Sequence, residues 1–469
     1  MCRFRAAAIK LATCGSVAAL LAILVSSPAH ASSRSDYPYD LVDLGTLGGP
    51  QGGVANDVPV PFSATGHSLF GTADTTTTDP YAANDNGFFS GDPFVQHAFV
   101  WRDGTITDLG ALGPLPGDNS SVATSVNARG DVAGASDNGA TDPTPGTGYE
   151  EARAVLWKDR HIINLGTLGG HESFAFSLND RDQVVGAAAN SVPDPVSMFG
   201  LGTQTRAFIW QDAAMRDLGT LGGPDAAAFF INNAGEVAGN AYTDATPNPD
   251  TGSPTTHPFL WHHGVMQDLG TLGGTLATVG SWDALNDHGE VVGQSNLAGD
   301  QTFHPFLADR HGLIDLGTFG GQLGSANAIN NSGEVVGWAA TTVPMTPPLG
   351  EPGDQLYEAF LWHHGTLTNL GTVRGDQCST ANGINDRGQV VGEAGHCHGA
   401  VDAFLSENHS TLNLNMLVAP SPLHLTGAFA INDRGEIAGI GVLPNGNQHA
   451  YVLIPRTKVS IARTVQRAR

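Results

Sequence analysis

The stretch RAFIWQDAAMRDLGTLGG, residues 206–223, decides the fold because variants of it recur along the whole chain. The second half of the same unit follows as AFFINNAGEVAG, residues 228–239. Such repeats are sought first, because they override any domain count based on length. The DLG leucine recurs as Leu44, Leu109, Leu165, Leu218, Leu269, Leu316, Leu370 and, in a degenerate copy, Leu414. The HAF-like element opens at His97, Arg153, Arg206, His257, His304, Glu358, Asp402 and His449.

Each unit contains four short runs rich in Val, Ile, Leu and Phe, bounded by Gly or Asn-Asp turn signals. Such runs are typical of β-strands, and no helical periodicity accompanies them. Two tight hairpins are readable per unit, through turns such as Arg102-Asp103-Gly104 and Asp386-Arg387-Gly388. Glycine there suits the left-handed position of a three-residue hairpin loop. Four antiparallel strands per repeat predict the blade of a β-propeller.

The two ends of the chain look like complementary halves of one unit. The first copy starts at Tyr39 without the strand that normally precedes DLG, and the last copy ends on that strand, at residues 449–453. The sequence therefore predicts an all-β, eight-bladed propeller of four-stranded blades, in which the N- and C-terminal strands share one blade. The runs with the smallest side chains, such as residues 121–125, are expected innermost. An open solenoid is the alternative, but it would need polar capping repeats.

The motifs HAFVW, RAFIW, HPFLW and EAFLW, followed by DLGTLGG and INxxGEVVG, resemble the HAF-repeat family of extracellular bacterial repeat proteins. The resemblance covers residues 38–455. It implies a secreted, propeller-like repeat protein, and it supplies no catalytic residues. The eighth unit departs from the pattern, because Asn413-Leu414-Asn415-Met416 replaces DLGT.

The first 31 residues have the parts of an export signal. Arg3, Arg5 and Lys10 flank the start of an apolar stretch at 11–25, and residues 29–31 read Ala-His-Ala. An N-terminal membrane anchor is the alternative, but this stretch falls short of the ~20 residues that span a bilayer. We therefore expect a secreted protein, extracellular or periplasmic, with no membrane span. The expected organisation is a cleaved signal at 1–31, a linker at 32–37, one propeller domain at 38–455 and a disordered basic tail at 456–469.

Acidic residues outnumber basic residues 45 to 21, which gives a formal net charge of -24. This charge argues against a nucleic-acid partner, because an acidic surface repels a polyanion. The hydrophobic fraction of 41% supports a large core and excludes a disordered chain. We expect a monomer whose partner is neutral or cationic, or is an anion bridged by calcium.

Long connections separate the second and third strands of five units, at 72–96, 137–151, 190–205, 242–256 and 341–357. In antiparallel blades these inserts and the GTLGG connections lie on one face, and the short hairpin turns lie on the other. Variable loops on a rigid scaffold often carry binding function. The loop-rich face is therefore the expected ligand face. The alternative is that the inserts are surface loops without function.

Residues that break the repeat are the best candidates for a site, because residues shared by all blades serve the scaffold. Trp282 and Asp283 interrupt an inner strand, and Trp338 follows a VVG motif, all toward the expected loop-rich end. Aromatic and carboxylate groups together suit carbohydrate stacking and hydrogen bonding. His396 and His398 are further ligand-binding candidates on that face. Packing between blades is the alternative for each tryptophan.

Cys378 and Cys397 are the only cysteines after the export signal. They flank one hairpin, and exported chains favour oxidation, so the sequence predicts a disulfide between them. Strand parity argues against it, because a strict three-residue loop places Gln377 opposite Cys397. A metal bound by the cluster at residues 396–398 is the alternative. No metal or cofactor is predicted, but calcium on the aspartates of the Asn-Asp pairs stays open beside their interpretation as Asx turns.

Enzyme motifs are absent from the sequence, including G-x-S-x-G, H-E-x-x-H and the P-loop, so catalysis is not predicted. The sequence favours a secreted binding or interaction module for a glycan or another cell-surface ligand. A glycan-active hydrolase or lyase is the first alternative, and a structural surface or matrix protein is the second. A hydrolase would need paired carboxylates, and the candidates are Asp283, Glu172, Glu151, Glu351 and Asp354.

Overall fold

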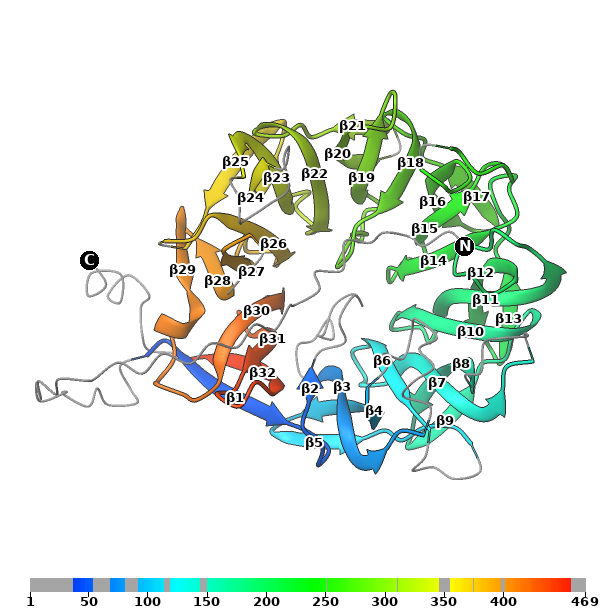
Figure 1. Ribbon diagram of the computed structural model, residues 1–469, viewed down its shortest axis with the longest axis horizontal. Helices are drawn as coiled ribbons and strands as arrows, with labels where there is room; N and C mark the ends of the chain where they lie inside the picture. Colours follow the sequence, from blue (N-terminus) through cyan, green and yellow to red (C-terminus); the bar gives the residue numbers. More distant parts are fainter. Residues whose placement is uncertain are drawn as a thin grey trace, which may run out of the picture.

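The structure, a computed structural model, is a ring of β-sheets around a central axis (Figure 1). It describes residues 37–53, 68–80, 92–113, 119–143, 150–249, 251–309, 311–345, 355–373, 375–397 and 401–456. These residues form 32 β-strands and one 3-10 helix, Leu414–Met416. The expected export signal, the linker up to residue 36 and the tail beyond Arg456 lie outside the described residues. No described helix is long and apolar enough to cross a membrane.

The strands form eight antiparallel groups of four, here given from the axis outward. The first three blades are β2 (Gly52–Gly53), β3 (Ser68–Thr78), β4 (Phe94–Arg102), β5 (Thr105–Asp108); β6 (Ser121–Val126), β7 (Val132–Thr141), β8 (Glu150–Lys158), β9 (His161–Asn164); and β10 (Gly169–Leu178), β11 (Val184–Pro193), β12 (Thr203–Gln211), β13 (Ala214–Asp217).

The next three blades are β14 (Ala226–Ile231), β15 (Val237–Tyr242), β16 (Thr256–His262), β17 (Val265–Asp268); β18 (Gly273–Val279), β19 (Val291–Leu297), β20 (Phe303–Asp309), β21 (Gly312–Asp315); and β22 (Gly320–Ile329), β23 (Val335–Pro344), β24 (Gln355–His363), β25 (Thr366–Gly371). The last two are β26 (Cys378–Ile384), β27 (Val390–Gly395), β28 (Val401–Glu407), β29 (Ser410–Asn413); and β30 (His424–Ile431), β31 (Ile437–Val442), β32 (Gln448–Pro455), β1 (Tyr39–Gly45).

The eighth blade contains both ends of the propeller. β1 pairs antiparallel with β32, and Leu41 lies opposite Leu453. Beyond β32, the backbone N–H of Arg456 donates to the carbonyl of Pro38 at 2.8 Å, and its guanidinium pairs with Asp40. The predicted eight-bladed ring, closed by strands from the two termini, is confirmed.

The two recurring motifs HAF and VVG pack against each other inside every blade. In the fourth blade, Gly239 of β15 lies opposite Phe259 of β16. A Cβ on Gly239 would lie 2.0 Å from the carbonyl oxygen of Ala227 and 2.7 Å from the Phe259 ring. Phe259 is fully buried. A larger residue at the glycine would push the aromatic ring out of the core, and this explains why the motifs recur together.

Side chains of the inner strands join neighbouring blades. Thr124 Oγ1 donates to the carbonyl of Ala175 at 3.0 Å, and Asn327 Nδ2 donates to the carbonyl of Ala381 at 2.9 Å. Single parallel bridges also connect the fourth, fifth and sixth blades into one 12-stranded sheet. The two side-chain bonds satisfy backbone carbonyls of the inner strands β10 and β26.

The histidine of the HAF element is part of the scaffold. In four blades its Nδ1 lies 2.8 to 3.0 Å from the aspartate of the neighbouring DLG element, and the pair fastens the third strand to the outer strand. The pairs are His97 with Asp108, His257 with Asp268, His304 with Asp315, and His449 with Asp43.

Candidate ligand-binding site

The asparagine of each AIN element links two blades. In the fifth blade, Asn286 Oδ1 accepts hydrogen bonds from the backbone N–H groups of His288 and Glu290, both at 3.0 Å. This is an Asx-type turn. Asn286 Nδ2 donates to Glu290 Oε2 at 2.6 Å and to the carbonyl of Asn330, in the next blade, at 3.1 Å. The same bond joins the third to the eighth blades through Asn179, Asn232, Asn286, Asn330, Asn385 and Asn432.

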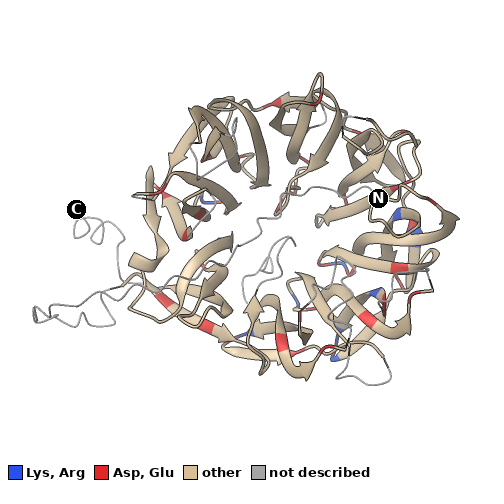
Figure 2. Cartoon of the chain, in the orientation of Figure 1, with Lys and Arg blue, Asp and Glu red and all other residues tan. Residues whose placement is uncertain are grey.

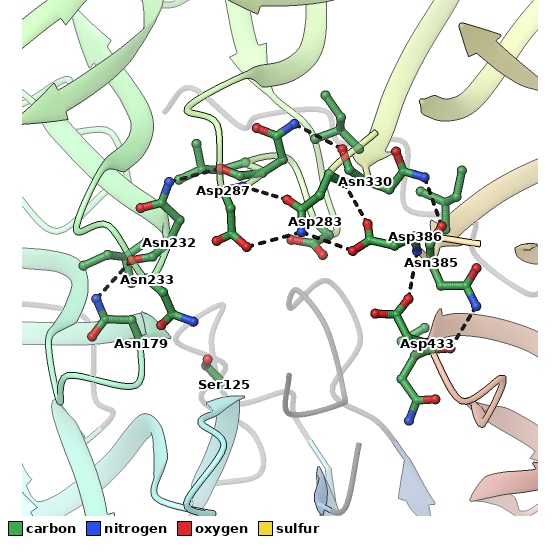
Figure 3. A pocket seen from close by; sticks show the side chains of 18 of the residues that line it. Ser125, Asn179, Asn232, Asn233, Asp283, Asp287, Asn330, Asn385, Asp386 and Asp433 are labelled. Carbon is green, nitrogen blue, oxygen red and sulfur yellow. Dashed lines mark hydrogen bonds between the residues drawn. The ribbon is translucent and has the colours of Figure 1, made fainter. Parts of the chain in front are cut away.

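The residue after each of these asparagines forms an acid-and-amide rim around the axis. The backbone N–H of Asn331 donates to Asp386 Oδ1 at 2.9 Å, and that of Asp386 donates to Asp433 Oδ1 at 2.9 Å. On the other side of the ring, the N–H of Asp180 donates to Asn233 Oδ1 at 3.0 Å. Five of the six rim side chains thus accept from a backbone N–H of a neighbouring blade, and Asp287 accepts from the side-chain amide of Asn331 (Figure 3).

The rim encloses an axial pocket of about 450 Å³ (Figure 3). Its walls are the ends of the inner strands and the turns that follow them, from the second to the eighth blade. Among the described residues, its lining contains no Lys, Arg or His side chain. It contains five carboxylates, those of Asp180, Asp283, Asp287, Asp386 and Asp433. A concave site lined by one sign of charge concentrates the electrostatic potential, so this pocket favours positive charge.

The fifth blade carries three extra residues in its inner strand. From the last glycine of GTLGG to the AIN asparagine, the chain advances 12 positions in this blade, from Gly274 to Asn286. It advances nine positions in the sixth blade, from Gly321 to Asn330. Consequently β18 ends at Val279, and the following residues leave the edge of the blade.

Trp282 and Asp283 belong to this insertion. The N–H of Trp282 donates to the carbonyl of Asn327 at 3.1 Å, and the carbonyl of Asp283 accepts from the N–H of Ile329 at 2.9 Å, so the sixth blade holds their backbone. The Trp282 ring stacks on Phe429 of the eighth blade, with centroids 4.9 Å apart. The insertion therefore crosses the channel and presents Asp283 to the middle of the pocket (Figure 3).

Asp283 differs electrostatically from an ordinary surface aspartate. Its carboxylate is accessible from the pocket, and no described residue forms a hydrogen bond with it. Desolvation by the surrounding channel wall raises its pKa to about 7, and the negative charges of Asp287 and Asp386 act in the same direction. Because the side chain is exposed to pocket water, enclosure by the ring rather than close packing causes the shift.

The structure corrects the expected position of Trp282 and Asp283. The repeat pattern predicts them toward the loop-rich face, whereas Asp283 lines a pocket at the face of the short turns. The three-residue insertion carries the pair to the far end of the inner strand. Counting residues between GTLGG and the AIN asparagine would have located the insertion. The rim aspartates were missed because each one, taken alone, has the pattern of a turn-forming residue.

The other candidates lie outside the pocket. Trp338 on β23 contacts Phe303 and Tyr357, with ring centroids 6.0 and 5.3 Å away, so it packs between the fifth and sixth blades. His396 is exposed just after β27. Neither residue lines the axial pocket. His398 lies outside the described residues.

The predicted disulfide between Cys378 and Cys397 is confirmed. Their Cα atoms lie 5.1 Å apart, and both side chains are buried beside Met345. The register places Gly395 opposite Cys378, so the bond reaches two residues beyond the paired position. Strand parity does not prevent the bond, because Cys397 lies past the end of β27.

A second pocket, of about 720 Å³, lies between the fourth and fifth blades on the face of the short turns. Its lining includes His262, His288 and His311. Within the described part of the chain, no three His, Cys, Asp or Glu side chains are grouped so that they could hold a metal ion. The axial pocket is the stronger candidate, because seven blades build it and the insertion of the fifth blade enters it.

Two carboxylates considered for a hydrolase lie near each other between the second and third blades. Glu172 is 3% exposed, and burial raises its pKa to about 8. Burial also acts on Glu151, but hydrogen bonds from Asn138 and two basic neighbours lower its pKa. Opposite shifts suit an acid-base pair, yet the Glu172 side chain is enclosed and offers no surface to a sugar. Glu351 and Asp354 lie outside the described residues.

Comparisons with known proteins return structural neighbours only. No protein-family model matches the sequence, and no curated protein matches it. The β-propeller domain of the Trilobed protease from Pyrococcus furiosus is similar with a TM-score of 0.41 and 8% identity, over 69% of this chain and 91% of that one. A gluconolactonase from Xanthomonas campestris is similar with a TM-score of 0.26 and 10% identity, over 65% of this chain and 79% of that one. Neither similarity bears on what this chain binds.

Proposed function

We propose that this protein is a secreted β-propeller of the HAF-repeat kind that binds an extracellular ligand in its axial pocket and does not transform it. The observation that carries the proposal is the insertion of the fifth blade, which places Asp283 in the middle of the pocket. Desolvation and the like charges of Asp287 and Asp386 raise the pKa of this carboxylate, so its ionised form opposes folding. A charged group that destabilises the fold and points into a cavity is typical of a binding site.

The rest of the pocket supports binding rather than catalysis. The rim carboxylates and amides hold the backbone of neighbouring blades, so they form a rigid frame. A rigid, preformed site loses little conformational entropy when its ligand binds. The disulfide and the export signal expected from the sequence support an extracellular or periplasmic location, where oxidation is favoured.

The test is a ligand screen of the mature protein, by glycan array and by thermal shift with small molecules, followed by calorimetry on each hit. Asp287→Trp, at the exposed rim, should fill the pocket and abolish binding. Trp338→Ala and His396→Ala, outside the pocket, are the matched controls and should leave binding unchanged. The reverse pattern would assign the ligand to the loop-rich face. Release of a cleaved product from any bound glycan would favour the hydrolase or lyase instead.

A further inference from the structure

We infer that the ligand group held in the axial pocket is an organic cation, an alkylammonium group bound by the carboxylate of Asp283. This inference rests on the proposed function and names the chemical class of its ligand. It depends on three features of the pocket: its charge, the free hydrogen-bonding capacity of Asp283, and the absence of a grouped set of metal ligands among the described residues.

The charge of the lining selects for a cation. Five aspartates and no basic side chain line the pocket among the described residues. The chain as a whole adds to this field, because its net charge is -24. Figure 2 shows Lys and Arg on the blades around the ring rather than across the middle of the channel. A carboxylate or phosphate ligand would enter against this potential, whereas an ammonium group is attracted by it.

Asp283 is the pocket carboxylate that is free to bind. Asp180 accepts from the N–H of Ala128 at 2.8 Å, and Asp386 and Asp433 accept from rim N–H groups. Asp287 accepts from the amide of Asn331 at 3.2 Å. No described residue forms a hydrogen bond with the carboxylate of Asp283. The rim aspartates therefore serve the ring, and Asp283 has both oxygens available for a ligand.

The arrangement fits an ammonium group better than a metal ion. Calcium takes six to eight oxygen ligands in close contact, and no three described carboxylate, imidazole or thiolate groups are placed to hold a metal ion. An alkylammonium carries three donors and can bind one carboxylate through a charge-assisted hydrogen bond. Its remaining donors can be met by rim amide oxygens or water. A second ammonium on the same ligand would be attracted by Asp287 and Asp386, whose carboxylates both accept from the amide of Asn331.

Proton exchange should accompany binding. The titratable groups that share the pocket with Asp283 are the other four aspartates. Desolvation, together with the charges of Asp287 and Asp386, raises the pKa of Asp283 to about 7. A bound cation favours the ionised carboxylate, so binding below about pH 7 should release a proton. Affinity should therefore rise with pH up to about 7 and then level off.

The experiment is calorimetry of the mature protein with 1,4-diaminobutane, and with 1,4-butanediol as the neutral control of the same length. A lysine-containing peptide, titrated separately, distinguishes a side-chain ammonium of a protein partner from a free amine. Asp283→Asn should lower the affinity for the amine by about 10- to 100-fold, since a charge-assisted hydrogen bond is lost. Asp212→Asn is the charge-matched control. It removes one carboxylate from a hairpin turn of the same face, where Asp212 has a φ of 51° that Asn tolerates. It should leave the affinity within about twofold.

The remaining outcomes separate this inference from the proposed function. If Asp283→Asn and Asp212→Asn lowered the affinity for the amine equally, the amine would be attracted only by the overall negative charge of the protein, and the inference would be overturned. If the protein bound calcium in a way that depends on Asp283 and did not bind the amine, the pocket would be a metal site, and the inference of an ammonium ligand would be refuted. A neutral ligand that Asp287→Trp excludes and Asp283→Asn does not affect would leave the proposed function standing and refute the cation. Ligand binding that Asp287→Trp does not weaken would refute the proposed function itself.

Discussion

Replacement of Asn330 by alanine should destabilise the ring by about 4 kcal/mol. Asn330 is 4% exposed. Its Nδ2 donates to Glu334 Oε2 at 2.7 Å and to the carbonyl of Asn385 at 3.0 Å. Its Oδ1 accepts from the N–H groups of Ser332 at 3.0 Å and Glu334 at 2.9 Å. Four hydrogen bonds at roughly 1 kcal/mol each give this loss, and the alanine leaves their partners without a replacement.

Two companion variants make the Asn330 prediction specific. Asn330→Asp keeps both accepted bonds but loses both donated bonds and adds a charge beside Glu334. At neutral pH, Asn330→Asp should lower the free energy of unfolding at least as much as Asn330→Ala does. Part of this stability should be recovered in acid, where the new carboxyl becomes protonated. Asn331→Ala removes an exposed rim amide that water can replace, so its cost should stay within about 1 kcal/mol.

The assay is urea unfolding followed by tryptophan fluorescence, with the free energy of unfolding compared across the three variants. The reasoning would be refuted if Asn330→Ala cost no more than Asn331→Ala. It would also be refuted if Asn330→Asp were as stable as the wild type at neutral pH, since the inter-blade bond would then contribute nothing.

Three further predictions concern the scaffold. Replacing both Cys378 and Cys397 by serine should cost about 3 kcal/mol in the chain-entropy model for a separation of 19 residues; an unchanged denaturation midpoint would argue against this. Burial raises the pKa of Glu172 from 4.5 to about 8, so its contribution to stability is full below about pH 4.5 and declines as the pH rises toward 8. Glu172→Gln should therefore be more stable than the wild type near pH 9 and similar to it near pH 4, and a difference independent of pH in thermal melts would contradict the assigned pKa. Truncation after Gly441 removes β32 and leaves β1 without its partner, so limited proteolysis should cut the whole ring rapidly; a truncated chain that resists protease like the full one would show that closure is dispensable.

The fold could be predicted from the sequence because the same local sequence pattern recurs in every blade. The glycine of VVG recurs in every blade opposite the third residue of the HAF element, which is Phe in six blades, Val155 in the second and Tyr451 in the eighth, and one contact, such as Gly239 with Phe259, requires it there. The incomplete first and last units predict the closure between β1 and β32, because each end supplies the strands that the other needs to complete a four-stranded blade. The disulfide was predictable for a similar reason, since a hairpin brings Cys378 and Cys397 together.

The candidate site could not be predicted from the sequence in the same way. The aspartates at positions 180, 287, 386 and 433 are far apart in the chain, and each has a local role in or beside an Asx turn. They face one pocket only because the ring closes and all inner strands end around the same axis. The direction of the insertion at Asp283 depends on pairing with the sixth blade and on stacking across the channel onto Phe429. Local patterns thus determine which strands form and how they pair, whereas the axial pocket depends on convergence of distant residues, which only the closed tertiary structure decides.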